Sequence, residues 1–200
     1  MPSSRIHTDY IGLTALALVA LSWIVFAVIF LLRKKPSQGK EAKRDSAATW
    51  GMVLQGCGFA LVWSIRRSYW WPISGWLAGE IILAVLAVVL AYTSNWFCYW
   101  AVQTLGKQWT YAARVIEGHE LITQGPYAVV RNPIYLGMFG LMVATGLVLA
   151  SWWALLLAVI LFAAGNQIRV RTEEKLLRDA FGQKFEEYAR NIPAFFPRIQ

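Results

Sequence analysis

The feature that most restricts the fold of this chain is an apolar stretch of about 35 residues, from Ile134 to Ile168. An α-helix rises 1.5 Å per residue, so about 20 residues cross the ~30 Å hydrocarbon core of a bilayer. The stretch is too long for one span, and Ala150-Ser151 interrupts it just before Trp152-Trp153. We therefore expect a hairpin of two membrane helices that turns at the far interface.

Three further apolar stretches precede this hairpin, at about 11–32, 50–65 and 76–102. We interpret the first as a retained helix rather than a cleaved signal peptide, because it is long and ends directly in basic residues. The second is short and rich in glycine, which favours a closely packed interior helix. In the third, Glu80 lies one turn from the start, where it either snorkels to the outer interface or serves as a proton site.

Together these stretches predict an all-α, polytopic membrane protein with about five transmembrane helices. The chain is 58% hydrophobic and only 15% charged, and its aromatic residues gather where the apolar stretches end, as is typical of membrane proteins. Its formal net charge of +8 is accounted for by the lipid bilayer, since anionic lipid attracts Lys and Arg. The basic residues do not form the one-sided stripe that would indicate a nucleic-acid partner.

The distribution of the 19 Lys and Arg residues predicts the orientation. If the basic linker after the first span is cytoplasmic, 16 of them lie inside, as the positive-inside rule prefers, and the N-terminus lies outside. Cys57 and Cys98 fall in apolar stretches and are expected to be small packing residues. The two histidines lack the spacing of metal ligands, so no metal site is expected.

Polar segments flank the C-terminal hairpin, and the fold-back brings them to one face. The first segment contains Arg131 among glycines and prolines. The second begins with Arg169 and Glu173, four residues apart on one helix face, and apolar residues continue that ridge in an amphipathic C-terminal helix. Both segments therefore contribute to one candidate site.

Simpler roles remain open for these residues when they are taken one by one. Arg169 and Glu173 could form an ordinary ion pair at a helix end, which is worth little if exposed. Arg131 could bind a lipid headgroup at the membrane surface. His119 could make a polar contact in the loop.

The order of motifs in the last hundred residues is more specific. The chain reads GHELITQGPY from Gly118, VRNPIYLG from Val130, and then Arg169 followed by Glu173-Glu174. This pattern resembles the isoprenylcysteine carboxyl methyltransferases and the related phospholipid methyltransferases. The first hundred residues are similar only in being apolar enough to span a membrane.

The resemblance implies S-adenosyl-L-methionine as cofactor, bound in a pocket on the cytoplasmic face without a Rossmann domain. Arg169 and Glu173 would be catalytic and would hold the methyl acceptor. Asn132 stands where the family usually has His, and asparagine can hydrogen-bond but cannot carry a proton, so proton transfer at this position is excluded. By position, the residues expected to line the cofactor pocket are His119, Leu121, Gly125, Pro126, Tyr127, Arg131, Asn132, Pro133, Tyr135 and Glu174.

These observations predict an integral membrane methyltransferase for a lipophilic acceptor, most similar to carboxyl methylation of isoprenylcysteine. An ionised carboxylate needs no general base, whereas an amine acceptor would make Glu173 the candidate base. The alternatives are methylation of a phospholipid or another small molecule at N or S, an NADPH-dependent sterol-type reductase, and a non-enzymatic membrane scaffold. The oligomeric state does not follow from the sequence.

The expected organisation has two parts. Residues 1–105 form the N-terminal membrane helices, and residues 106–200 form the methyltransferase-like region. That region divides into a cofactor loop at 106–133, the helical hairpin at 134–168, and a C-terminal helix and tail at 169–200.

Overall fold

The computed structural model describes residues 3–32, 41–44, 47–66, 77–106, 114–116 and 120–195. The helices of this part of the chain are α1 (Ser3–Leu31), α2 (Ala47–Ser64), α3 (Leu77–Leu105), α4 (Pro133–Leu149), α5 (Trp152–Phe181) and α6 (Gln183–Asn191), with a 3₁₀ turn η2 (Gly125–Ala128). Two short strands, β1 (Glu41–Arg44) and β2 (Arg114–Ile116), pair antiparallel. The predicted all-α membrane fold is confirmed, including the C-terminal hairpin α4–α5.

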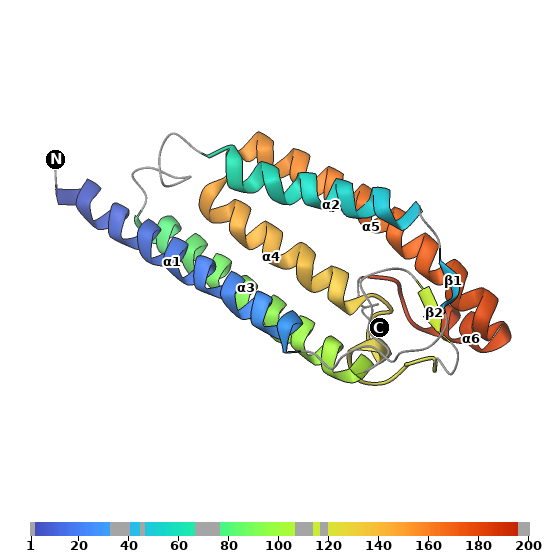
Figure 1. Ribbon diagram of the computed structural model, residues 1–200. Helices are drawn as coiled ribbons and strands as arrows, with labels where there is room; N and C mark the ends of the chain where they lie inside the picture. The colour runs from blue at the N-terminus through green and yellow to red at the C-terminus, as the bar shows by residue number, and fades with distance from the viewer. Residues whose placement is uncertain are drawn as a thin grey trace.

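The long helices form two layers with α4 between them, as Figure 1 shows. Helices α1 and α3 lie on one side of α4, and α2 and α5 lie on the other. Successive long helices run in opposite directions, so η2, the strand pair and α6 all gather at one end of the bundle. We call this end the site end, and the end with the α4–α5 turn the far end.

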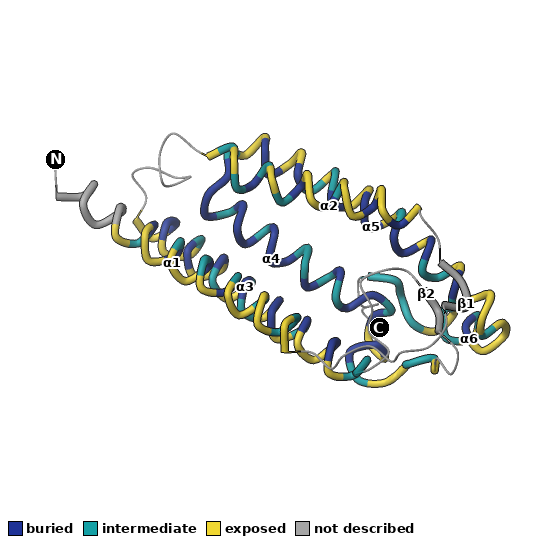
Figure 2. The backbone as a smooth tube through the Cα atoms, in the orientation of Figure 1, coloured by how far each residue is buried: buried dark blue, intermediate teal, exposed yellow. Residues whose placement is uncertain are grey.

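Three of the described helices are long and apolar enough to cross a membrane: α1 from Tyr10, α3 and α5. Helix α4 is apolar but has only 17 residues. The outward faces of the bundle carry large exposed apolar side chains such as Ile82, Leu86 and Trp96, while α4 is mostly buried, as the burial colours in Figure 2 show. Exposed apolar surface of this extent is compatible with lipid rather than water as the surrounding solvent.

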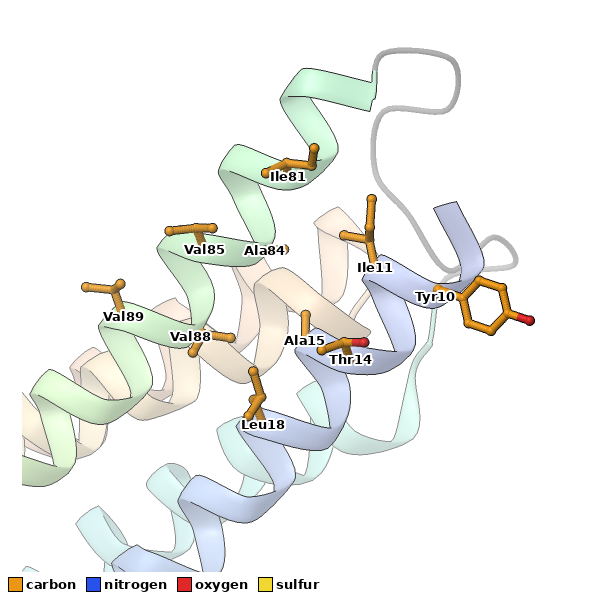
Figure 3. A pocket seen from close by; sticks show the side chains of 10 residues that line it. All are labelled: Tyr10, Ile11, Thr14, Ala15, Leu18, Ile81, Ala84, Val85, Val88 and Val89. Atoms are coloured by element: carbon orange, nitrogen blue, oxygen red, sulfur yellow. The ribbon is translucent and has the colours of Figure 1, made fainter. Parts of the chain in front are cut away.

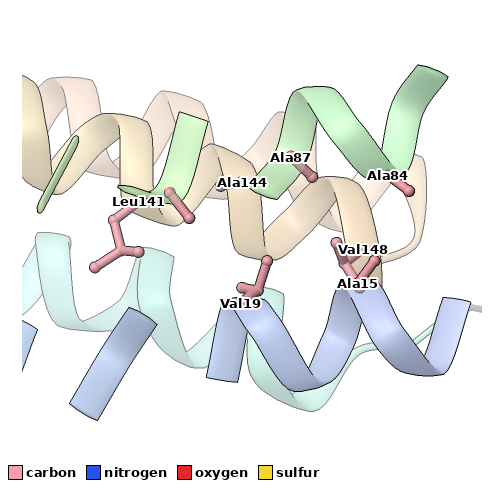
Figure 4. Packing of buried hydrophobic residues seen from close by; sticks show 8 residues of the cluster. Ala15, Val19, Ala84, Ala87, Leu141, Ala144 and Val148 are labelled. Carbon is pink, nitrogen blue, oxygen red and sulfur yellow. The ribbon is translucent and has the colours of Figure 1, made fainter. Parts of the chain in front are cut away.

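Small residues allow α1 and α3 to approach α4 closely. Ala84, Ala87 and Ala91 recur along one face of α3 and pack with Val19 and Leu141 (Figure 4). A second cluster around Phe162 joins α2, α4 and α5. Close packing of small side chains is a principal source of helix association in membranes, where lipid is as apolar as the helices.

Two side chains differ from the sequence expectation. Glu80 does not snorkel outward but is buried, with 1% of its surface exposed, because it lies on the inward face of α3 one turn before Ala84. Cys57 is exposed on α2 rather than packed, whereas Cys98 is buried as expected.

The segment after Ile168 also differs from the prediction, which had an amphipathic C-terminal helix that begins at Arg169. Helix α5 continues without a break from Trp152 to Phe181, and the chain turns only at Gly182, whose φ of 52° favours glycine. The second helix of the hairpin therefore carries its membrane-spanning part and its polar part as one rigid rod.

An apolar groove of about 400 Å³ lies between α1 and α3, towards the far end. Figure 3 shows that Ile11, Ala15 and Leu18 of α1 face Ala84 and Val88 of α3 across it. Its lining is almost entirely aliphatic and includes none of the predicted site residues. The polar chemistry of the molecule lies elsewhere.

Candidate active site

The hairpin brings the two predicted polar segments into direct contact at the site end. Helix α4 begins at Pro133, directly after Arg131 and Asn132, and α5 returns with Arg169, Glu173 and Glu174 in its last four turns. A proline at the first helical position suits this start, because its missing N–H would have no helical partner there. The two segments are joined by an ion pair and by side-chain hydrogen bonds.

Arg169, Glu173 and Tyr135 form the inner cluster. The Nη2 of Arg169 lies 3.3 Å from Oε1 of Glu173, and the Tyr135 hydroxyl donates a hydrogen bond to the same carboxylate oxygen. The guanidinium carbon of Arg169 lies 4.9 Å from the centre of the Tyr135 ring. Arg169 is therefore held both by a carboxylate and by an aromatic face, and it is 9% exposed.

Two residues that the sequence reasoning missed extend this cluster towards α2. Gln55 donates a hydrogen bond to Oδ1 of Asn166, and the Oε1 of Gln55 is 3.5 Å from Nη1 of Arg169. The signal that could have found Gln55 is its amide in an otherwise apolar span, since polar groups within a membrane are costly and commonly functional.

Arg131 forms an outer cluster that fastens the C-terminal segment. Its Nε and Nη2 each lie 2.9 Å from Oε1 of Glu174, and its Nη1 donates to the carbonyl oxygens of Ala189, at 2.8 Å, and Ile192. The backbone N–H of Arg131 also donates to the Pro193 carbonyl, at 2.9 Å. Most donors of this guanidinium are therefore engaged within the protein.

Asn132 takes part in the same attachment. Its backbone N–H and its side-chain Nδ2 both donate to the carbonyl of Ala194, at 3.2 and 3.1 Å. Although Asn132 occupies the N-cap position of α4, its side chain does not cap the helix. The amide at this position thus acts as a hydrogen-bond donor, which asparagine can supply without a titratable group.

The turn η2 closes the site against α3 and α6. Gly125 has a φ of 60°, and a Cβ built there would lie 3.0 Å from Oγ1 of Thr104. Tyr127 is buried, and its carbonyl accepts a 2.6 Å hydrogen bond from the Tyr188 hydroxyl. Burial raises the pKa of Tyr188 to about 12, so its phenol remains a proton donor in this bond at neutral pH.

Three further residues predicted to line the cofactor pocket lie close to η2 and to the start of α4. Pro126 and Pro133 are buried at the starts of η2 and α4, where they shape the backbone. Leu121 is half-buried in the stretch before η2. His119 lies outside the described residues. Across the described ranges, no group of three His, Cys, Asp or Glu side chains could hold a metal ion.

The fold and this cluster define a class of protein: a polytopic helical membrane protein with a buried arginine–carboxylate site where two polar segments meet at one end of the bundle. The family model described as phospholipid methyltransferase matches residues 82–184, which include most of α3, the hairpin, and Arg131, Arg169 and Glu173 of the site. The chain belongs to this family, and the predicted family resemblance is confirmed.

Curated relatives match parts of the chain. It is 34% identical over 139 residues to the cobalt-zinc-cadmium resistance protein CzcN of Cupriavidus metallidurans, covering 60% of this chain and 61% of that protein. It is 28% identical over 136 residues to protein-S-isoprenylcysteine O-methyltransferase B of Arabidopsis thaliana, covering 66% and 63%. With the protein-S-isoprenylcysteine O-methyltransferase of Schizosaccharomyces pombe it shares 35% identity over 44% of this chain and 37% of the relative. The chain spans about three fifths of the length of the first of these relatives.

Proposed function

We propose that this protein is an integral membrane methyltransferase that uses S-adenosyl-L-methionine to methylate a lipophilic acceptor, most similar to the carboxyl methylation of isoprenylcysteine. The observation that carries the proposal is the buried cluster of Arg169, Glu173 and Tyr135 at the end of the membrane helices. Its place inside the region matched by the phospholipid methyltransferase model supports the same conclusion.

The side chains present suit this cofactor. Tyr135 contributes an aromatic ring, and aromatic faces attract cations such as the sulfonium of this cofactor. Glu173 and Glu174 add negative charge beside it. When bound, S-adenosylmethionine supplies an electrophilic methyl group on a positively charged sulfur. We assign its binding to the segment from His119 to Tyr135, together with Glu174.

The protein's own residues would then bind and orient the acceptor. Arg169 presents a planar fork of donors that matches a carboxylate, and Glu173 and Tyr135 fix the position of that fork. The apolar helices beside the cluster would exclude water, which removes the hydration shell of a carboxylate nucleophile. No general base is needed, because a carboxylate is ionised at neutral pH.

We also propose the arrangement in the membrane. The site end would face the cytoplasm, the N-terminus would lie outside, and residues 106–200 would carry the cofactor and acceptor sites. A water-soluble cofactor would enter from the cytoplasm, and an apolar acceptor would enter from the bilayer.

The first experiment is a titration of purified protein in detergent with S-adenosylmethionine, its demethylated product and NADPH. We expect binding of the first two. Preference for NADPH would instead support a reductase, and binding of none of the three would support a scaffold.

The second experiment addresses the acceptor. Protein with radiolabelled donor is incubated with a farnesylated cysteine that has a free carboxylate, and in parallel with the same compound as a carboxamide. The proposal predicts label only in the first product, released by mild base as expected of a methyl ester. In a third reaction with phospholipid vesicles as acceptor, base-stable label would instead establish amine methylation, with Glu173 as the candidate base.

A further inference from the structure

Two buried carboxamides connect helix α2 to the candidate active site. Gln55 is 3% exposed and Asn166 is 6% exposed, and both lie in the apolar interface between α2 and α5. A carboxamide in this environment is costly unless its polar atoms have partners. Gln55 has them: its Nε2 donates to Oδ1 of Asn166, and its Oε1 faces Nη1 of Arg169 at 3.5 Å.

The orientation of the Gln55 amide follows from these partners. Asn166 accepts through its oxygen, so the nitrogen of Gln55 must point to Asn166 and the oxygen to Arg169. An acceptor is the group that a guanidinium requires. The guanidinium therefore requires the oxygen of Gln55 to face it, and Asn166 stabilises that orientation by accepting from the Gln55 nitrogen.

A pair of glycines brings α2 close enough for this contact. A Cβ on Gly51 would lie 2.4 Å from Cγ of Arg169 and 2.7 Å from the carbonyl oxygen of Gly165. A Cβ on Gly165 would lie 2.6 Å from the carbonyl oxygen of Gly51. The aliphatic stem of Arg169 thus lies directly against the backbone of α2, one turn from Gln55.

We infer that Gln55, oriented by Asn166, is a positioning residue that holds the guanidinium of Arg169 at Nη1, while Glu173 holds it at Nη2. This inference rests on the proposed function, because it assumes that Arg169 binds the acceptor. The family motifs all lie in the C-terminal half of the chain. The inference adds Gln55, a residue of the N-terminal helix α2, to the site. Gln55 touches neither acceptor nor cofactor in this role.

The kinetic test compares Gln55→Met and Asn166→Leu with Asn95→Leu. Methionine keeps the length of glutamine without its hydrogen bonds. Asn95 is the matched control, since it is a buried carboxamide of α3 that donates to the Ser22 carbonyl, away from the site. A displaced Arg169 should lower kcat with the farnesylated cysteine by about 10- to 100-fold, while S-adenosylmethionine affinity stays at the wild-type value. Asn95→Leu should retain wild-type kcat.

A second measurement tests the role of Gln55 without relying on enzymatic turnover. In ¹⁵N-arginine-labelled protein, the Nε–Hε signal of Arg169 is assigned by its loss in Arg169→Lys. Gln55→Met and Asn166→Leu should shift and mobilise this signal, and Asn95→Leu should leave it unchanged.

The outcomes separate the two proposals. A wild-type protein that neither binds S-adenosylmethionine nor turns over contradicts the proposed function, and the arginine signal then still tests Gln55. If the Arg169 signal and kcat in Gln55→Met match those of the control variant, Gln55 only packs, and the inference is overturned.

Discussion

Replacing Arg131 by methionine should release the C-terminal segment from the site end of the bundle. The guanidinium has three acceptors: the Glu174 carboxylate and the carbonyls of Ala189 and Ile192. Hydrogen bonds that involve a charged group contribute about 1.5–3 kcal/mol each, so three fully buried ones would contribute about 4.5–9 kcal/mol. Water has some access, because the side chains of Arg131 and Glu174 are 14% and 15% exposed. We therefore expect a local loss of about 3–5 kcal/mol, as for breaking a buried ion pair.

Hydrogen exchange measures this loss directly. The amide of Asn132 donates to the Ala194 carbonyl, so its protection reports attachment of the tail, and the amides of α6 report the helix itself. Since 1.4 kcal/mol is tenfold in an equilibrium constant, these amides should exchange about 100-fold faster or more in Arg131→Met. Amides in the middle of α4 should keep their protection.

A matched variant tests the reasoning on burial. Arg178 also pairs α5 with α6 through Glu186, but these side chains are 46% and 47% exposed. Exposed pairs contribute about 0–1 kcal/mol, so Arg178→Met should speed exchange in α6 by less than about tenfold. Equal effects of the two substitutions would refute the claim that the Arg131 cluster, rather than any α5–α6 ion pair, holds the segment.

Two further predictions concern the inner cluster. Arg169→Ala and Glu173→Ala should each lower methyl transfer by about 100-fold or more with little change in S-adenosylmethionine affinity, and unchanged turnover would remove that residue from the site. Gly51→Ala should lower the free energy of unfolding by about 1–3 kcal/mol in a detergent denaturation assay, because its Cβ would overlap the stem of Arg169. Gly56→Ala is the control, since its Cβ would meet nothing within 4 Å, and it should be neutral or stabilising by up to about 1 kcal/mol. A Gly51→Ala protein as stable as this control would show that α2 and α5 do not need their close approach.

The sequence predicted the meeting of the two polar segments because that result depends on lengths alone. An apolar stretch too long for one span must fold back, and its two ends must then emerge on the same side. The contacts between Arg131 and Glu174 and between Tyr135 and Glu173 follow from that fold-back. The hairpin could therefore be predicted from the length of the apolar stretch, without any knowledge of how the helices pack.

Other features could not be predicted because their partners are far apart in the chain. Nothing local to Arg131 indicates that main-chain carbonyls about 60 residues later take its donors. Likewise, Gln55 meets Arg169 only because the glycines Gly51 and Gly165 let two helices approach, and glycine in a membrane span is compatible with many packings. The burial of Glu80 depended on which face of α3 turns inward, which hydropathy does not specify.

The central claim is that both polar segments face the same compartment and share one site. It is tested most directly by labelling single cysteines with a membrane-impermeant maleimide in intact and permeabilised cells, on a background with Cys57 and Cys98 replaced by alanine. Gln124→Cys and Lys175→Cys should react only after permeabilisation, and Arg66→Cys, at the far end, should react in intact cells. Labelling of the first two positions from opposite sides of the membrane would contradict the account.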